Sequence, residues 1–199
     1  MQEKCDNGSA FLRHIDEIRR LVLEKTATLD SPLLIAIDGR SSSGKSTLSS
    51  LLLREGLAGA ILHTDDFYLP LSLRTSERMA HYCGHMDLSR LEKEALIPHA
   101  LGQEIKYRPF SCKRQAFLET LVIPRATPIV LEGSYSLFPS LRKYSHIRIL
   151  LDTDCQRERL LVREGEEGLL RFEKMWLPRE EEYLAATHPE QIADIIIKT

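Results

Sequence analysis

The apolar residues of this chain follow two different spacings. In residues 9–28 they recur every three or four positions, as Phe11, Ile15, Ile18 and Val22, with charged residues between them. This spacing predicts an N-terminal helix over 9–28. Elsewhere the apolar residues form short continuous runs, which are typical of strands buried on both faces. Five runs have strand length: residues 33–37, 60–63, 127–132, 147–152 and 192–197.

Residues 69–128 lack this alternation of strand and helix. Residues 87–96 predict a short helix that is capped by Asp87 or Ser89 and ended by Pro98. Two further segments, 104–110 and 116–123, predict a β-hairpin. An insert of this length usually carries function, so we expect residues 69–128 to form the pocket for a second substrate.

The first strand-like run leads directly into a glycine-rich motif. Gly39-x-x-x-x-Gly44-Lys45-Ser46 lies between this run and a leucine-rich helical segment, as a phosphate-binding loop does. Its glycines let backbone N–H groups surround phosphate oxygens, and the following helix adds the positive end of its dipole. We expect Lys45 to meet the β- and γ-phosphates and Ser46 to bind Mg²⁺. The alternative is a Gly/Ser-rich turn. The predicted contacts to a nucleoside triphosphate are Gly39, Ser41, Ser42, Ser43, Gly44, Lys45, Ser46 and Thr47.

Carboxylates follow two other strand-like runs. Asp65 and Asp66 come after residues 60–63, and Glu132 ends the run 127–132. Ligands of open α/β sheets bind beyond the carboxyl ends of the strands, so at least one of the two aspartates is predicted to be catalytic. Glu132 is predicted to order the metal opposite Ser46. The alternatives are a turn or helix cap for the aspartates and a charged turn for Glu132.

The run 147–152 is followed by a basic segment. Arg159 and Arg163 are four residues apart and share one face of a predicted helix. Arginine stabilises the charge of a phosphoryl group in transfer, so residues 154–172 are predicted to form a lid. Gly165 and Gly168 are expected to make that lid mobile. The alternative is a solvated helix surface.

The 199 residues are 43% hydrophobic and 28% charged, as in an ordinary globular protein, and predict a single domain over 1–199. The net charge of −2 argues against a general nucleic-acid binder. No apolar run approaches the ~20 residues that span a bilayer. The four cysteines form no CxxC pair, so reduced thiols and a cytoplasmic location are expected. The segment 81–85 holds two histidines and a cysteine, but their irregular spacing does not favour a zinc site.

Taken together, the motifs resemble the uridine kinase and phosphoribulokinase group of P-loop kinases. Residues 156–178 look particularly like a bacterial uridine kinase-like subgroup. The stretches that carry the resemblance are Ile37-Asp-Gly-Arg-Ser-Ser-Ser-Gly-Lys-Ser-Thr47, Thr64-Asp-Asp-Phe-Tyr68, Ile129-Val-Leu-Glu-Gly-Ser-Tyr135 and Leu151-Asp-Thr-Asp154.

This resemblance implies a three-layer α/β P-loop NTPase fold with a five-stranded parallel sheet, a helical lid and a helix and β-hairpin insert for the acceptor. It implies ATP and Mg²⁺ as cofactors and a nucleoside as acceptor, while assembly into homo-oligomers, common among related kinases, stays open. Asp65 matches the carboxylate that engages the attacking hydroxyl and is also expected near the metal. Arg159 and Arg163 match lid arginines. Tyr68 and Asp87 match residues that hold the nucleoside, and Phe110 and Gln115 stand where the family has its base-reading residues.

The sequence therefore predicts an ATP-dependent kinase that transfers the γ-phosphoryl group to a hydroxyl of a small molecule, such as uridine or cytidine. Two alternatives stay open. The acceptor could be another hydroxylated metabolite, such as a vitamin precursor or a sugar phosphate, which the basic hairpin residues Lys106, Arg108, Lys113 and Arg114 would suit. The protein could also be a nucleotide-dependent binding switch with little transfer activity.

Overall fold

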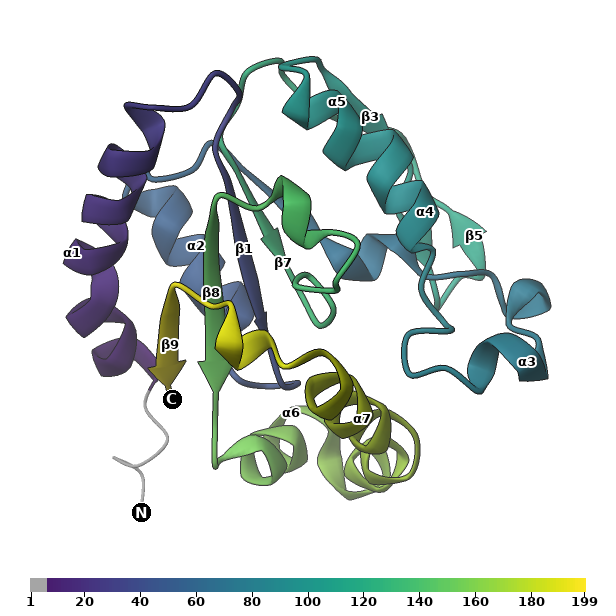
Figure 1. Ribbon diagram of the computed structural model, residues 1–199. Helices are drawn as coiled ribbons and strands as arrows, with labels where there is room; N and C mark the ends of the chain where they lie inside the picture. The colour runs from purple at the N-terminus through teal and green to yellow at the C-terminus, as the bar shows by residue number, and fades with distance from the viewer. Residues whose placement is uncertain (1–6) are drawn as a thin grey trace.

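A five-stranded parallel sheet forms the centre of the molecule in the computed structural model, which describes residues 7–199 (Figure 1). Its strand order is β2-β7-β1-β8-β9, so β1, which leads into the glycine-rich motif, is the middle strand. All neighbours run parallel, and Ile37 of β1 pairs with Glu132 of β7 and Ile149 of β8. The strands are β1 (Leu34–Gly39), β2 (Ala60–His63), β7 (Ile129–Glu132), β8 (Ile147–Asp152) and β9 (Ile195–Lys198).

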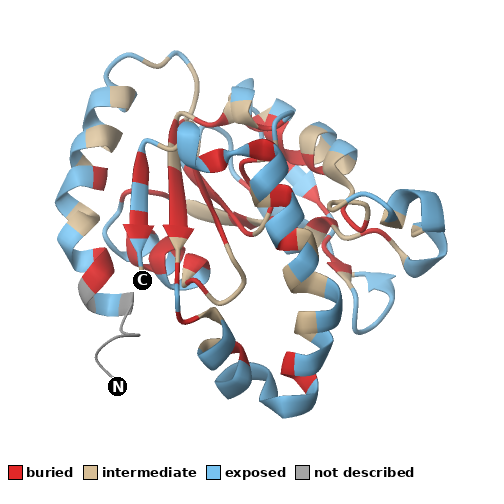
Figure 2. Ribbon diagram, turned by 60° about the horizontal axis from the view of Figure 1, so that its bottom comes forward, coloured by how far each residue is buried: buried red, intermediate tan, exposed pale blue. Residues whose placement is uncertain are grey.

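Helices cover both faces of the sheet and make three layers. Because side chains alternate along a strand, Ile35 and Ile37 pack on one face with α1 (Asn7–Thr26) and α2 (Lys45–Arg54). Leu34 and Ala36 pack on the other face with α4 (Leu88–Leu91) and the helical turns that follow it. In Figure 2 the sheet strands are largely buried, while the outer helical faces are exposed. The three-layer α/β fold and the five parallel strands are confirmed.

The insert contains the predicted hairpin in two short pieces. β3 (Ile105–Tyr107) pairs with β6 (Leu121–Ile123), and β4 (Phe110–Ser111) pairs with β5 (Ala116–Phe117). Between the two pieces stands Pro109, which has no N–H to donate but accepts a bond from Leu118 N (2.8 Å). Short helical segments precede the hairpin at Thr64–Phe67, Leu71–Leu73 and Ser76–Met79 (α3).

Pro98 does not end a helix as the sequence predicted, and a second proline, Pro178, lies in a similar place. The helix that begins at α4 passes through a π-helical turn at Glu92–Leu96 and continues as α5 (Ile97–Ala100), with Pro98 in its first turn. In the same way α6 (Gln156–Arg171) passes through a π-helical turn at Phe172–Trp176 into α7 (Leu177–Thr187), with Pro178 in its first turn. Each π-helical turn shifts the register of the backbone hydrogen bonds directly before the proline. The missing N–H of the proline therefore does not stop the helix.

The predicted lid segment, 154–172, lies at the carboxyl edge of the sheet (Figure 1). Its helix α6 is interrupted at Gly165, whose φ of 70° and ψ of 179° are not helical. Single helical turns also occur at Arg142–Tyr144 and Pro189–Gln191.

The cysteine expectation holds only in part. Cys83 and Cys112 are free thiols, whereas Cys155 is disulfide-bonded, contrary to the prediction of reduced thiols. Cys5 lies outside the described residues. Within residues 7–199, no helix has the length and apolar character needed to cross a bilayer.

Candidate active site

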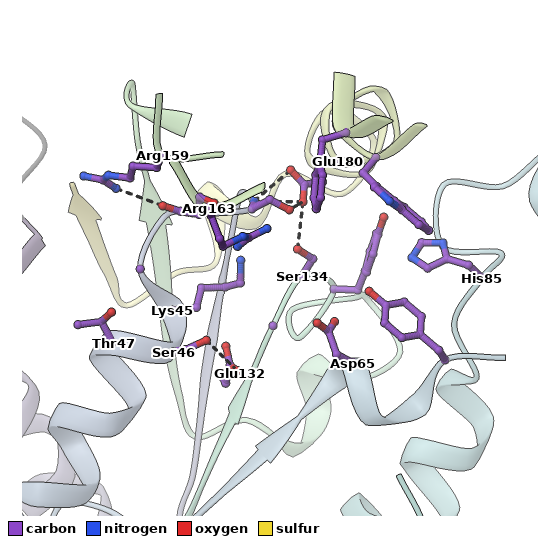
Figure 3. Close-up of a pocket in the computed structure, with 18 residues that line it drawn as sticks. Lys45, Ser46, Thr47, Asp65, His85, Glu132, Ser134, Arg159, Arg163 and Glu180 are labelled. Atoms are coloured by element: carbon purple, nitrogen blue, oxygen red, sulfur yellow. Dashed lines mark hydrogen bonds between the residues drawn. The ribbon is translucent and has the colours of Figure 1, made fainter. Parts of the chain in front are cut away.

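The sheet topology brings the predicted functional segments to one cavity of about 460 Å³ at the carboxyl ends of its strands (Figure 3). The glycine-rich loop follows β1, Asp65 follows β2, Glu132 ends β7, and α6 follows β8. The cavity is lined by Ser41, Ser42, Gly44, Lys45, Ser46, Thr47, Asp65, Tyr68, His85, Glu132, Gly133, Ser134, Tyr135, Arg159, Arg163, Phe172, Trp176 and Glu180.

The loop takes its shape from two glycines. Gly39 has a φ of 140°, and a Cβ at this position would lie 2.2 Å from the carbonyl oxygen of Leu151. Gly44 has a φ of 98° and precedes the first turn of α2. Six of the eight predicted loop contacts line the cavity; the other two are Gly39 and Ser43, and Ser43 is fully buried. The loop and the first residues of α2 therefore line the cavity together.

Lys45 and Ser46 lie on the same wall as Glu132 (Figure 3). The ammonium group of Lys45 donates to the carbonyl oxygens of Gly39 (2.9 Å) and Arg40 (2.8 Å). Ser46 Oγ donates to Glu132 Oε1 (3.2 Å), and Nδ1 of His63 lies 2.5 Å from the same oxygen. This hydrogen bond to the carboxylate is the main cause of the raised pKa of His63.

Ser46 and Glu132, which the sequence predicted as Mg²⁺ ligands, bring a hydroxyl oxygen and a carboxylate oxygen together, and oxygen is the ligand type that Mg²⁺ prefers; metal binding itself stays a prediction. Mg²⁺ prefers oxygen ligands and is usually held by one or two carboxylates together with waters and substrate phosphates. In residues 7–199 no cluster of three or more His, Cys, Asp or Glu side chains could hold a metal ion by itself. A single carboxylate beside a hydroxyl next to the phosphate loop suits a metal that arrives with the triphosphate.

Asp65 and Asp66 point to different surroundings although they are adjacent. Asp65 lines the cavity and its side chain is exposed there. Desolvation by the protein atoms near its carboxylate raises the pKa of Asp65, although Lys45 and a hydrogen bond from Tyr68 oppose the shift. Asp66 is outside the cavity lining, and its Oδ2 accepts a hydrogen bond from the hydroxyl of Tyr107 (2.9 Å). The geometry therefore separates a carboxylate that can meet a ligand from one that holds the insert.

Arg159 and Arg163, which the sequence predicted as lid arginines, line the cavity from α6. Arg159 Nη1 donates to the carbonyl oxygen of Ser42 (3.3 Å) and to Thr199 Oγ1 (3.1 Å), which ties the loop to the residue that follows β9. Arg163 Nε donates to Glu164 Oε1 (2.7 Å), and its guanidinium lies over the ring of Phe172 (5.4 Å to the centroid).

Of the predicted acceptor residues, Asp65 and Tyr68 line the cavity, whereas Asp87, Phe110 and Gln115 do not. Asp87 caps α4, as the sequence also predicted, by accepting from Arg90 N (3.0 Å). Phe110 is buried against Phe117 (5.3 Å between centroids). Gln115 Nε2 donates to the carbonyl oxygen of Cys112 (2.6 Å). Acceptor binding by these last three residues stays a prediction.

Helix α7 brings a carboxylate to the phosphate loop that the sequence did not reveal. Both oxygens of Glu180 lie 3.1 Å from the backbone nitrogen of Ser41 and accept from it, and Glu180 also accepts from Ser41 Oγ. Ser134 Oγ (3.3 Å) and Gln156 Nε2 (2.8 Å) donate to the same carboxylate. No local motif signals this contact, because Ser41 and Glu180 are 139 positions apart in the chain.

A second missed carboxylate, Asp38, lies beneath the loop. It is 1% exposed and accepts three hydrogen bonds, each of 2.7 Å: from the backbone N–H groups of Gly39 and Leu137 and from the hydroxyl of Tyr183. Burial raises its pKa, while the three donors oppose the shift. Asp38 therefore joins the start of the loop to α7.

Known proteins similar to this chain include several kinases. No family model matches it. A stretch of 134 residues is 28% identical to a uridine kinase from Chloroflexus aggregans and covers 63% of each chain, so the match spans less than two thirds of that relative.

Several solved structures are similar to this chain over most of its length. A protein designated a possible uridine kinase, from Bacillus stearothermophilus, has a TM-score of 0.69 at 21% identity, over 92% of this chain and 98% of that one. A protein provisionally named a fructose transport system kinase, from Silicibacter sp. TM1040, has a TM-score of 0.72 at 20% identity, over 89% and 95%. D-glycerate 3-kinase from Cryptococcus neoformans has a TM-score of 0.64 at 15% identity, over 88% of both. The chain thus has the fold of the P-loop kinases, and its resemblance to the uridine kinase and phosphoribulokinase-like group is confirmed.

Proposed function

We propose that the protein is an ATP-dependent kinase that transfers the γ-phosphoryl group to a hydroxyl of a small molecule, with a nucleoside such as uridine or cytidine as acceptor. The observation that carries the proposal is the common cavity: the phosphate loop, the Ser46–Glu132 pair and the Asp65 carboxylate all line it. A protein that only binds a nucleotide needs just the phosphate loop and the Ser46–Glu132 pair. A carboxylate across the cavity from the loop is what an acceptor hydroxyl requires.

The loop is proposed to hold the triphosphate. Lys45 would exchange its bonds to the carbonyl oxygens of Gly39 and Arg40 for β- and γ-phosphate oxygens, with the loop amides around them. Ser46 and Glu132 would hold Mg²⁺, which when bound offsets the negative charge of the phosphates.

Asp65 is proposed to orient the acceptor and to receive its proton. The hydroxyl donates to the carboxylate, its oxygen forms the new bond to phosphorus, and the bond from phosphorus to the β-phosphate oxygen breaks to leave ADP. The proton passes to Asp65, whose raised pKa favours its acceptance. Arg163 and Arg159 line the same cavity from the lid side and are proposed to stabilise the charge on the transferring group.

A pair of variants tests this proposal, because the chain has two adjacent aspartates in different surroundings. Asp65→Asn should lower the rate of ADP formation with uridine and Mg–ATP by about 100-fold or more, with little change in ATP affinity measured by calorimetry. Asp66→Asn is the control, since this residue is outside the described lining of the cavity and bonds to Tyr107. Turnover of the Asp65 variant at the wild-type rate would remove Asp65 from the reaction.

A further inference from the structure

Helix α7 meets the glycine-rich loop through two adjacent carboxylates. Both oxygens of Glu180 accept from the backbone N–H of Ser41, each at 3.1 Å. Glu181 accepts from Nε and Nη2 of Arg40, each at 2.9 Å. Glu180 is 5% exposed and lines the cavity, whereas the Glu181 side chain is 57% exposed and lies outside the described lining. A ligand in the cavity therefore lies next to the charge of Glu180, while water screens that of Glu181.

Glu180 also connects the loop to the start of the predicted lid. Gln156, the first residue of α6, donates from Nε2 to this carboxylate (2.8 Å), and Ser134, just after β7, donates from Oγ (3.3 Å). Helix α6 carries Arg159 and Arg163, which line the cavity. In Figure 3, Glu180 lies on the same side of the cavity as Arg163 and is joined to Ser134 by a dashed line. The carboxylate thus holds both α6 and α7 against the loop.

The Glu180 contact falls at the part of the loop that is proposed to meet the terminal phosphate. Lys45 Nζ donates to the carbonyl oxygen of Arg40 (2.8 Å), and the next residue, Ser41, is the one that bonds to Glu180. The N–H groups of such a loop attract anions, but this carboxylate uses one of them and adds a negative charge of its own. Because Glu180 is buried, its charge is little screened and repels a phosphate group more strongly than a surface carboxylate would.

We infer that Glu180 is a positioning residue of the proposed reaction: it opposes binding of the terminal phosphate and keeps the lid arginines at the cavity. This inference rests on the proposed kinase function, which places the γ-phosphate beside Lys45. ADP has no γ-phosphate, so Glu180 weakens the binding of ATP more than that of ADP. Removing the charge therefore strengthens nucleotide binding, whereas loosening the bonds to α6 and the loop slows transfer.

Calorimetry with Mg²⁺ and a non-hydrolysable ATP analogue tests the effect on binding without any turnover. Glu180→Gln removes the charge and keeps the size of the side chain, so this variant should bind the analogue about fivefold more tightly than the wild type. The gain should be smaller for ADP. Glu180→Asp keeps the charge and shortens the side chain, so it should show no such gain.

Glu181→Gln is the matched control. It removes the same charge one position further along α7, from a carboxylate outside the described lining of the cavity, and should bind the analogue as the wild type does. Urea unfolding establishes that each variant is folded.

The rate of ADP formation with uridine tests the effect on transfer. In Glu180→Gln both the KM for ATP and kcat should fall, the first because binding tightens and the second because Arg159 and Arg163 are held less firmly. A side chain that only supports the fold would not tighten nucleotide binding when it is replaced. The opposite directions of affinity and rate are therefore the signature of the proposed role.

Four results would each overturn the inference: analogue binding by Glu180→Gln that is unchanged or weaker, an equal gain in Glu181→Gln, an equal gain in Glu180→Asp, or a kcat that does not fall while product forms. If Glu180→Gln tightens analogue binding and the wild type phosphorylates no acceptor, the effect of Glu180 on the nucleotide stands and the proposed function fails. If product forms and the analogue binds no more tightly to Glu180→Gln, the inference fails and the proposed function stands.

Discussion

The bond between Tyr183 and Asp38 offers a test of how helix α7 is held to the glycine-rich loop. Tyr183→Phe removes one hydroxyl from a side chain that is 1% exposed and leaves the ring in place. Asp38 then keeps only the backbone donors Gly39 and Leu137, both at 2.7 Å. The buried carboxylate loses a donor that no water can easily replace.

The expected cost follows from the type of bond. A hydrogen bond to a charged group contributes about 1.5–3 kcal/mol, so the free energy of unfolding should fall by that amount. For a domain of this size the melting temperature should drop by roughly 3–12 °C. Urea and thermal denaturation measure both quantities.

The cost should also depend on pH. Burial raises the folded-state pKa of Asp38 above 3.8, and Tyr183 opposes that shift, so its loss raises the pKa further. A group whose pKa is higher in the folded state stabilises the fold at pH values below its unfolded-state pKa. This contribution to stability is lost as the pH rises through the folded-state pKa. The variant should therefore lose more stability relative to the wild type at pH 8 than at pH 4.

Tyr144→Phe is the matched control. The Tyr144 hydroxyl donates to Glu92 at 2.6 Å, but Glu92 is 26% exposed and also pairs with Lys143. Water can replace this donor, so the loss should be below about 1 kcal/mol. Equal losses in the two variants, or a Tyr183 loss below about 0.5 kcal/mol, would refute the argument that burial makes the Asp38 bond strong.

Two further predictions concern the carboxyl ends of β2 and β7. The pKa of Asp65 is raised, and only the charged form of this carboxylate accepts a proton. As the pH is lowered, kcat/KM should therefore begin to fall at a higher pH than it would with an ordinary aspartate. A value of kcat/KM that stays constant down to about pH 4 contradicts this prediction. Gly133→Ala should cost about 3 kcal/mol or more, because φ is 134° and the new Cβ would lie 2.0 Å from Thr64 Oγ1. Gly102→Ala, with a φ of 65° and no described atom within 4 Å, should cost about 1 kcal/mol, and equal urea midpoints for the two variants would contradict the role of close packing.

The sequence predicted the parts of this molecule that depend on local patterns. The run that forms β1 is apolar throughout because both faces of the sheet are covered, and its predicted and observed limits nearly coincide. The glycine-rich loop follows β1 and Glu132 ends β7, so their meeting at one sheet edge could be foreseen. Asp87 as a helix cap is a similarly local feature.

What the sequence could not predict depends on distant contacts. Glu180 and Tyr183 belong to an ordinary charged helix, and only the fold brings them to Ser41 and Asp38. His85 lies in a loop whose neighbours in space come from three other segments.

The two prolines show a different limit. The sequence predicts that Pro98 ends a helix, because proline cannot donate an N–H, yet the helices continue through both Pro98 and Pro178. The π-helical turns that precede them change the hydrogen-bond register, and no residue preference signals such a turn. One of these turns carries Trp176 to the cavity.

The central claim is that this cavity transfers a phosphoryl group from ATP to a hydroxyl of a small molecule. Mass spectrometry of the wild-type protein incubated with Mg–ATP and a mixture of uridine, cytidine and other ring-bearing alcohols tests it most directly. The predicted result is ADP together with one acceptor that has gained a single phosphoryl group, both abolished in Asp65→Asn. ADP with inorganic phosphate and no phosphorylated acceptor, or a product that the Asp65 variant makes equally well, would contradict the account.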